Sequence, residues 1–407
     1  MKKFLASTLL VLAVFTAAVF ARAQGGQNVQ EIIKVTPFNT ASIVITGDAQ
    51  LAQFAHQAFQ SHGRYVRVAR DGSFTLTFTR AGEAQVRVDV AKAGGALVAS
   101  RTAGGKDLQD ALYRAADAAV RETGGGNGYF AARLAFVRKT GAGKGEIHIG
   151  DLFLNQVRRL TDHGSDILTP RWSPDGTKLL YTSFFIGGNP DIYQIDLAAG
   201  RWTPFASYKG TNMGARFSPD GSRVVMVLSG NNGAPNLYTI DACGQGKPAA
   251  LTSTQEAKSS PCYSPDGRRI VFAKEPGPQL HLINAAGGEP ERLRLSAGGN
   301  YAAEPDWSRA KPNLIVFTTR QGGVFRVAVH DLATGKTRVI APKDANGVAL
   351  DGDFIEPVWL PDGRHVVCTH RTPGARSLHI LDTGENSSNR ATKISSGYAE
   401  LPSVWSP

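Results

Sequence analysis

The sequence predicts a mainly β protein in which a six-bladed β-propeller follows a small α/β domain. Three observations support this fold class. A turn motif recurs at a nearly fixed spacing, strand-like segments fill each interval, and a helix-containing pattern precedes the first interval. A spacing of this length is typical of a repeated strand-rich unit such as a propeller blade.

The recurring turn is Ser-Pro-Asp-Gly, and an aromatic residue precedes each copy. Proline presets φ, aspartate bonds its own backbone and glycine accepts a positive φ, so the motif predicts a hairpin turn. Copies begin at Ser173, Ser218 and Ser264, with a variant at Leu360–Gly363. The aromatic markers are 45, 46, 44, 52 and 46 residues apart: Trp172, Phe217, Tyr263, Trp307, Trp359 and Trp405.

Each interval has room for four antiparallel strands, which make one blade. In the first, a strand ending near Trp172 is followed by strands at 178–182, 191–197 and 201–205. The second strand recurs at 223–228, 269–273, 313–318 and 365–369, and the third at 237–241, 280–284, 324–331 and 378–382.

Two incomplete units flank the repeats. Leu401–Trp405 supplies only an innermost strand, whereas segments 133–137, 146–151 and 157–160 supply strands without a preceding aromatic marker. Pairing the two units closes a ring of six blades and removes an exposed edge from each. The propeller is therefore expected over residues 131–407.

Residues 24–130 predict a small α/β domain. Its helices are expected at 49–60, where apolar residues share one face, and at 107–122, where Asp107 is the expected N-cap. Strands are expected at 43–46, 65–68, 73–79, 84–90 and 96–101, and Gly124–Gly128 is the expected hinge into the propeller.

The first 23 residues have the pattern of a secretion signal. A basic start, the apolar run Phe4–Phe20 and the small-residue site Ala21–Ala23 predict cleavage before Gln24 and an exported chain that does not span the membrane. An odd number of cysteines excludes a complete disulfide framework. We expect Cys243, Cys262 and Cys368 to be buried apolar residues.

The formal net charge is +11, and the basic residues are scattered along the chain. Because no basic run exceeds two residues and the chain is predicted to be exported, a nucleic-acid partner is not expected. Solubility is the simplest role for the charge, and attraction to anionic envelope surfaces is the alternative.

No catalytic residue, metal ligand or cofactor is predicted. The sequence has no Gly-x-Ser-x-Gly nucleophile elbow. His148, His281 and His379 share one column of the third strands, which favours a packing role. Acids at the ends of these strands, such as Asp196 and Asp241, fit turns.

Binding residues are expected where the repeat is irregular, in the segments just before each innermost strand at one mouth of the channel. These are 167–169, 212–214, 259–260, 303–304, 355–356 and 398–400. Glu304, Glu356 and Glu400 would place carboxylates at this mouth. They could pair with basic partner residues or a channel cation, or they could simply be exposed loop acids.

Taken together, the motifs resemble the TolB family, the periplasmic component of Tol-Pal systems. The resemblance covers nearly the whole mature chain. It rests on the Ser-Pro-Asp-Gly turns, Asp117 with the glycines after it, Arg133–Val137, Glu304–Trp307, Glu356–Trp359 and Pro402–Pro407.

The resemblance implies a non-enzymatic periplasmic scaffold that supports outer-membrane integrity and cell division. Its propeller mouth would bind Pal, the peptidoglycan-associated lipoprotein, and its small domain would face TolA or other envelope proteins. Positions matching the Pal surface are Thr211, Gly214 and Ser259. The full set expected to bind the partner is Thr211, Asn212, Gly214, Ser259, Ser260, Glu304, Glu356 and Glu400.

Three departures from the family pattern stand out. The small domain is contracted between Val66 and Asp71, the family usually has histidine at Thr211, and its TolA-binding peptide has no clear match in Gln24–Ile33. Two alternatives stay open: a metal-dependent sugar lyase on a six-bladed propeller, and a divergent relative that binds another envelope partner. No histidine lies in the expected mouth segments, which counts against the lyase.

Overall fold

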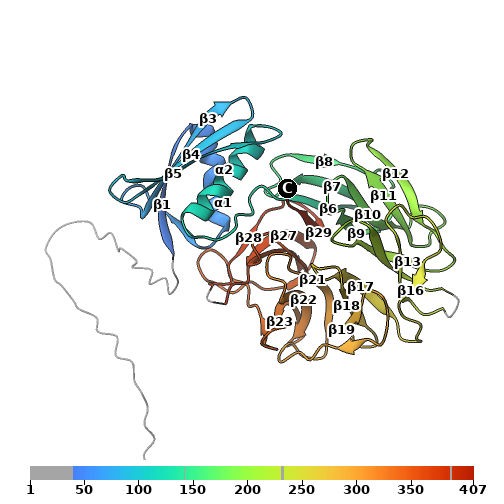
Figure 1. The fold of residues 1–407 in the computed structure, drawn as a ribbon. Coiled ribbons are helices and arrows are strands. Elements are labelled where there is room, and N and C mark those ends of the chain that lie inside the picture. The colour runs from blue at the N-terminus through green and yellow to red at the C-terminus, as the bar shows by residue number, and fades with distance from the viewer. Residues whose placement is uncertain (1–39, 142, 231–232, 386) are drawn as a thin grey trace, which may run out of the picture. The chain divides into compact units, whose positions relative to one another are not determined.

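The computed structural model describes residues 40–141, 143–230, 233–385 and 387–407. They form a five-stranded sheet with two helices, followed by six four-stranded sheets arranged as a propeller (Figure 1). The fold class predicted from the sequence is confirmed. The expected signal peptide and residues 24–39 lie outside the described residues.

The small domain has a mixed sheet with the strand order β2-β1-β3-β4-β5. β1 pairs in parallel with β2 and β3, and the remaining pairs are antiparallel. The strands are β1 (Ala41–Gly47), β2 (Tyr65–Arg67), β3 (Phe74–Gly82), β4 (Gln85–Lys92) and β5 (Leu97–Gly104).

Two capped helices pack on this sheet and on each other, α1 (Ala49–Ser61) and α2 (Leu108–Glu122). The Asp48 carboxylate accepts hydrogen bonds from the amides of Gln50 and Leu51, and Asp107 accepts one from Asp110. These contacts satisfy amides that have no partner within the helix. Both predicted helices are confirmed, including the Asp107 cap.

Each propeller blade is an antiparallel sheet of four strands, numbered here from the first complete repeat. Blades one to three are β9 (Ile167–Trp172), β10 (Lys178–Ser183), β11 (Asp191–Asp196) and β12 (Arg201–Ala206); β13 (Asn212–Phe217), β14 (Arg223–Leu228), β15 (Asn236–Asp241) and β16 (Ala249–Ala250); β17 (Lys258–Tyr263), β18 (Arg269–Lys274), β19 (Gln279–Asn284) and β20 (Glu291–Arg292). Blades four to six are β21 (Ala302–Trp307), β22 (Leu314–Gln321), β23 (Val324–Asp331) and β24 (Thr337–Val339); β25 (Asp353–Trp359), β26 (His365–Thr372), β27 (Ala375–Asp382) and β28 (Ala391–Lys393); β29 (Ala399–Trp405), β6 (Arg133–Gly141), β7 (Lys144–Asp151) and β8 (Val157–Arg159).

The ring closes as predicted, because β29 is the innermost strand of the sheet that β6 begins. Val404 pairs with Leu134, and Ser403 pairs with Ala135. The Trp172 indole of blade one donates to the carbonyl oxygen of Ser403 at 3.1 Å, and the Trp405 indole donates to that of Pro174 at 3.0 Å. The closing strand is therefore bonded both within its own blade and to the next.

The register of β29 corrects the sequence alignment of the last repeat by one residue. Glu400 pairs with Val137 and Ser403 with Ala135, as Ile355 pairs with Thr369 and Val358 with Val367 in blade five. The equivalent of Trp359 is therefore Val404, and Trp405 lies one residue beyond the aromatic column. By the same register Leu401, and not Glu400, is the counterpart of Glu356.

Every innermost strand contains a β-bulge at the same place. Two of its residues lie opposite one residue of the next strand, and the first of the two has a positive φ. In five blades the second is proline, which has no N–H to leave unpaired. The positive-φ residues are Thr169, Gly214, Ser260, Glu304, Glu356 and Leu401, with φ from 47° to 66°.

Apolar side chains fill the spaces between neighbouring blades. Val225 and Leu237 of blade two, for example, pack with Ile270 and Phe272 of blade three, and all four are fully buried. Cys262 and Cys368 are buried as expected. The prediction is wrong for Cys243, which is exposed because it lies in the turn after β15, where its amide donates to the Asp241 carboxylate.

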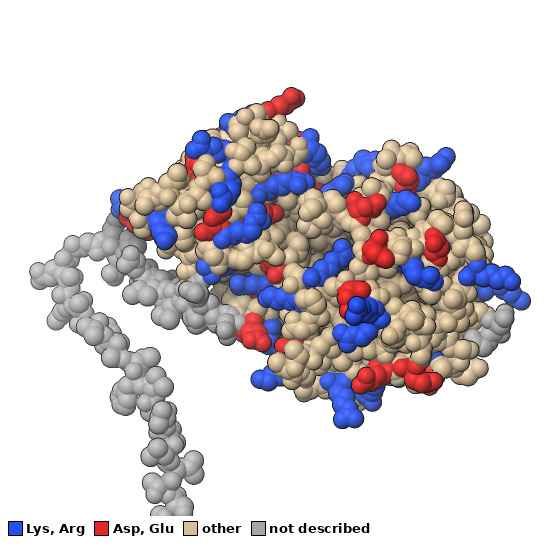
Figure 2. Space-filling model, viewed as in Figure 1, with Lys and Arg blue, Asp and Glu red and all other residues tan. Residues whose placement is uncertain are grey.

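Charged side chains of both signs are intermingled on the face shown in Figure 2, as the scattered basic residues of the sequence predict. Of the residues that the structure describes, none belongs to a helix long and apolar enough to cross a membrane.

Removing the closing strand tests its structural role. Deleting residues 399–407 would expose the edge of β6 and the buried faces of two blades. The cost should exceed the roughly 5–15 kcal/mol of net stability typical of a domain. We expect the cooperative thermal transition, followed by circular dichroism, to disappear. Deleting only Ser406 and Pro407, which lie beyond β29, should leave the transition nearly unchanged; equal effects of the two deletions would contradict this role.

Candidate functional site

The segments predicted to bind a partner lie in the first halves of the innermost strands, at the end of the channel that we call the channel mouth. They were expected to precede the strands, but most of their residues belong to them, because pairing begins before the bulge. The bulge residues Thr169, Gly214, Ser260, Glu304 and Glu356 are partly exposed. The bulge thus places residues of several chemical types at the same backbone position, including two glutamates.

Two glutamates of the channel mouth join neighbouring blades. Glu304 Oε2 accepts hydrogen bonds from the Thr318 hydroxyl at 2.6 Å and from the Glu356 amide at 3.0 Å. Glu356 Oε2 repeats the pattern with the Thr369 hydroxyl at 2.6 Å and the Leu401 amide at 2.9 Å. These carboxylates therefore hold the bulge of the following blade and are not free loop acids.

The two carboxylates also interact electrostatically. Burial among protein atoms, followed by the charge of Glu356, raises the pKa of Glu304 to about 7. Glu304 therefore holds its proton more tightly than an ordinary glutamate does. A positive charge that approached this pair would favour its ionised form.

Glu400 does not belong with these glutamates, which corrects the sequence-based grouping. Its side chain is only 3 % exposed, and its carboxylate lies 3.3 Å from Lys139 Nζ and contacts Arg376. Lys139 also pairs with Asp166 at 2.5 Å. Glu400 occupies the place of Ile355, one residue before the bulge, so its side chain lies in this buried ion-pair network between blades five and six, where a protein partner would not reach it.

The positions matched to a Pal surface differ in exposure. Thr211, Gly214, Ser259 and Ser260 are partly exposed, whereas Asn212 is fully buried. The Asn212 amide group donates to Asp191 Oδ1 at 3.0 Å and to the carbonyl oxygen of Tyr208 at 2.7 Å. Asn212 thus fixes the loop that carries Thr211, which is a supporting role. Whether any of these residues binds a partner stays a prediction.

At the other end of the channel, the aromatic column surrounds a cavity of about 400 Å³. Arg171, Arg216 and Asp306 line it, and Arg216 Nη1 lies 2.6 Å from Asp306 Oδ1. Burial, followed by the charge of Arg216, lowers the pKa of Arg171 to about 9. The channel thus carries carboxylates near the bulges and guanidinium groups beside the aromatic residues.

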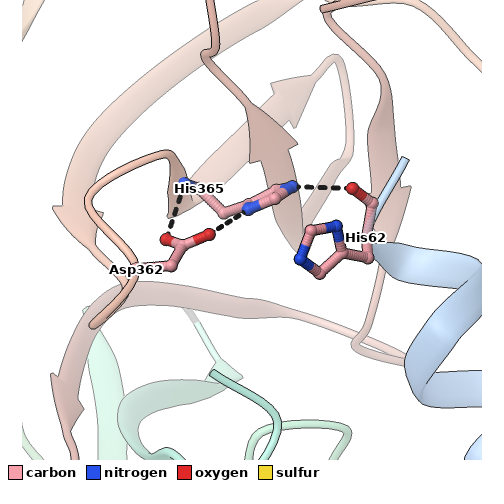
Figure 3. Close-up of side chains that lie close together, drawn as sticks. All are labelled: His62, Asp362 and His365. Carbon is pink, nitrogen blue, oxygen red and sulfur yellow. Dashed lines mark hydrogen bonds and ion pairs between the residues drawn. The ribbon is translucent and has the colours of Figure 1, made fainter. Parts of the chain in front are cut away.

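The variant turn Leu360–Gly363 contributes to a junction between the propeller and the small domain. In the regular turns a serine hydroxyl donates to the aspartate, as Ser173 does to Asp175 at 2.5 Å. Leu360 has no hydroxyl, and Asp362 Oδ2 instead accepts from His365 Nδ1 at 2.5 Å (Figure 3). The broken repeat therefore fixes a histidine where the regular copies have Lys178, Arg223 or Arg269.

His365 joins this turn to the small domain. Its Nε2 donates to the carbonyl oxygen of His62, the C-cap of α1, at 3.0 Å. Burial alone would lower the pKa of His365, but the carboxylates of Asp362 and Asp382 outweigh it and the pKa is raised. Arg364 binds both oxygens of Asp382, at 2.8 and 2.6 Å, so the buried charges of the junction are paired.

The His62 side chain completes this junction cluster, which we define as His62, Asp362 and His365. The His62 ring stacks on Tyr129 at 5.4 Å and lies 4.8 Å from the His365 ring. Burial, followed by the charge of His365, lowers the pKa of His62 to about 3. In the described part of the chain, this is the group of three potential metal ligands whose donor atoms all lie within 4.8 Å of one another.

Asp117 of α2 holds the segment that connects the two domains. Its carboxylate accepts hydrogen bonds from the amides of Phe130 and Ala131 at 2.7 and 3.1 Å, and burial raises its pKa to about 7. A Cβ atom at Gly128 would lie 2.3 Å from this carboxylate, so only glycine fits there. The domain boundary expected at residues 130 and 131 lies in this segment and stays a prediction.

Comparison with known proteins identifies the fold family. The family model described as PD40, the TolB beta propeller domain, matches residues 121–407. The chain belongs to this family. The resemblance inferred from its motifs is therefore confirmed.

Curated TolB relatives match a shorter region. The Tol-Pal system protein TolB of Bordetella pertussis is 37 % identical over 186 residues, which are 45 % of this chain and 42 % of the relative. The Bordetella parapertussis protein of the same name gives the same values. The match thus spans less than half the length of these relatives.

Solved structures of TolB proteins share the fold. TolB from Acinetobacter baumannii has a TM-score of 0.75 with 23 % identity, covering 90 % of this chain and 96 % of that one. A putative TolB from Agrobacterium tumefaciens has a TM-score of 0.51 with 16 % identity, covering 66 % and 90 %. At these identities the comparison supports the architecture of both domains, and no particular contact.

Glu304 gives a testable pH dependence. Because its pKa is about 7 in the folded protein and 4.5 is its ordinary value, the folded state binds the proton more tightly. Its contribution to stability is therefore present below pH 4.5 and is lost as the pH rises toward 7, by roughly 3 kcal/mol at most. Glu304→Gln, which mimics the protonated form, should remove this loss in urea unfolding at pH 5 and pH 8. Parallel pH profiles of the two proteins would show that Glu304 does not titrate in this way.

Asp117 should be important for stability. Asp117→Ala leaves two buried amides unpaired, at about 1–3 kcal/mol each. Asp117→Asn keeps one acceptor oxygen and should cost less. Denaturant unfolding measures the loss, and limited proteolysis should cut the alanine variant faster within residues 124–132. The control is Asp89→Ala, which removes a surface pair with Arg87 and should change stability by at most about 1 kcal/mol; a similar loss in both variants would argue against the role of Asp117.

Proposed function

We propose that this protein is a non-enzymatic scaffold of the bacterial envelope that binds a Pal-like lipoprotein through the channel mouth. Membership of the TolB propeller family supports the Tol-Pal assignment. The observation that carries the binding surface is the bulge shared by all six innermost strands. In five blades the bulge residue is partly exposed, and its type varies on one repeated backbone, which is how a rigid scaffold presents recognition residues.

Contacts with the partner would centre on Thr211, Gly214, Ser259 and Ser260. These residues come from the neighbouring blades two and three, and all are partly exposed. A Cβ atom built on Gly214 would lie 3.7 Å from Cδ of Pro261. The innermost strands of blades two and three therefore approach closely there. Small residues at this place would let a partner backbone come near the bulges.

Glu304 and Glu356 would contribute charge to the same surface. Their carboxylates already accept backbone and hydroxyl hydrogen bonds, so they would attract a basic partner group or a cation into the channel and not form a flexible contact. Asn212 would act indirectly, by holding its loop. Glu400 is not among the proposed contacts, because Lys139 and Arg376 pair with its buried carboxylate.

The cellular role follows from the partner. A periplasmic protein that binds Pal would help to link the outer membrane and peptidoglycan to the inner-membrane Tol proteins, in support of envelope integrity and division. Export by the signal expected at residues 1–23 is part of this proposal, and so is a contact of the small domain with TolA.

A sugar lyase would need histidine and carboxylate ligands that face a substrate in the channel. In the described ranges, the junction cluster combines these residue types, but His62 and His365 are fully buried where the small domain meets blade five. The scaffold therefore accounts better for the geometry. A divergent relative that binds another envelope protein would have the same surface and would fail the test below.

Titration of the purified protein with Pal from the same organism tests the proposal. Ser259→Trp places a bulky ring in the partly exposed mouth and should weaken binding at least about tenfold, a change of 1.4 kcal/mol. Arg268→Ala serves as the control, because this exposed residue lies in a turn at the opposite end of the strands. Calorimetry should show wild-type affinity for the control. No binding of Pal to the wild type would reject the partner, and unchanged affinity of Ser259→Trp would reject the surface.

A further inference from the structure

His62 presents a problem that the scaffold function does not explain. Its side chain is fully buried, and neither ring nitrogen has a hydrogen-bond partner among the described residues. Leaving a buried polar group unpaired costs about 1–3 kcal/mol. Native proteins usually satisfy such a group with water or an ion. The His62 ring is aimed at the two other members of the junction cluster (Figure 3).

The cluster has the donor atoms of a transition-metal site. It offers two imidazole nitrogens and one carboxylate oxygen within 4.8 Å of one another. Two histidines with one carboxylate are a common ligand set for Zn²⁺, and a water molecule can complete the tetrahedron. Softer thiolate ligands are not involved, because Cys262 and Cys368 do not belong to the group.

The surroundings hold two of these ligands in the orientation that a metal requires. His365 donates its Nε2–H to the carbonyl oxygen of His62, which leaves Nδ1 as the nitrogen directed at Asp362. The other oxygen of Asp362 accepts from the amides of Arg364 and His365, at 3.0 and 2.9 Å. A backbone carbonyl behind a histidine and amides behind a carboxylate are typical supports of metal ligands.

The charge balance is compatible with a cation. Arg364 donates two hydrogen bonds to Asp382, and the charges of these two side chains cancel. Asp362 is therefore the carboxylate whose negative charge can balance a cation in the cluster. The proton between Asp362 and His365 occupies the place that a metal ion would take. Because the two atoms are 2.5 Å apart and tetrahedral Zn²⁺ ligands are about 3.3 Å apart, binding must separate them by less than 1 Å.

We infer that His62, Asp362 and His365 form a Zn²⁺ site that fastens the small domain to blade five of the propeller. The ion replaces one proton and gives the unpaired His62 ring a partner. Since one ligand follows the end of α1, one lies in a propeller turn and one begins β26, the bound ion resists separation of the domains. The role is structural and independent of Pal binding.

Metal analysis of the untagged mature protein is the direct test. After loading with ZnSO₄ and dialysis, elemental analysis should find one equivalent of zinc per chain. His62→Leu and Asp362→Asn should each lose that equivalent. His379→Leu should keep it, because His379 is also buried with an unpaired Nδ1 and a pKa lowered to about 3, but lies outside the cluster.

Thermal unfolding distinguishes a metal site from a proton-held cluster. With a bound ion, EDTA should lower the wild-type Tm and ZnSO₄ should restore it, while His62→Leu should respond to neither. Cobalt substitution should give the visible absorption of a tetrahedral Co²⁺ ion in the wild type alone. If the wild type holds no zinc, or if His62→Leu binds as much zinc as the wild type, the inference is wrong. A His62→Leu protein at least as stable as the zinc-loaded wild type would also overturn it.

Discussion

Closure of the ring by β29 is the interaction on which the propeller depends. An open arc of blades would leave β6 and the first blade with exposed edges and half-covered apolar faces. Pairing of β29 with β6, for example of Val404 with Leu134, gives the edge of β6 its backbone hydrogen-bond partners. At the seam between blades six and one, the Trp172 indole donates a hydrogen bond to the closing strand. The innermost strands around the channel, with their bulges at the mouth, are held in place only when this seam is formed.

The bulges turn that closed frame into a surface. In a regular inner strand, side chains would alternate between the two faces of the sheet along its whole length. One extra residue with positive φ in each strand rotates a single side chain out of the pattern. Where the residue is glutamate it ties its blade to the next, and where it is Gly214 or Ser260 the surface stays open. Recognition and blade-to-blade bonding thus use the same structural position.

The sequence predicts those parts of the fold that rest on local, repeated patterns. The turns, the blade strands, both helices and the closure follow from spacing and alternation, and the Asp107 cap follows from its own side chain. The register of the last repeat could not be obtained in this way. Trp405 lies one residue after Val404, which is the true counterpart of Trp359, so aligning the two tryptophans shifts the repeat by one residue. Glu400 is a separate case, because it occupies the buried place of Ile355, just before the bulge. Which mouth residues bind a partner depends on a surface that no repeat encodes.

The junction cluster shows a different limit. His62 and His365 are 303 residues apart and belong to no common pattern, so only the folded chain brings them together. A local signal did exist: Leu360 replaces the turn serine and His365 replaces a basic residue in the same copy. Two departures from a repeat within six residues mark a place where another constraint acts.

The topology of the seam also sets an order of folding. Blades one to five each form from neighbouring segments of chain, whereas blade six joins segments far apart in sequence, as the pairing of Val404 with Leu134 illustrates. Contacts of such long range carry the largest loop-closure entropy and form late. The blade that β6 begins is thus the last to be completed, and the channel mouth acquires its final shape at the end of folding.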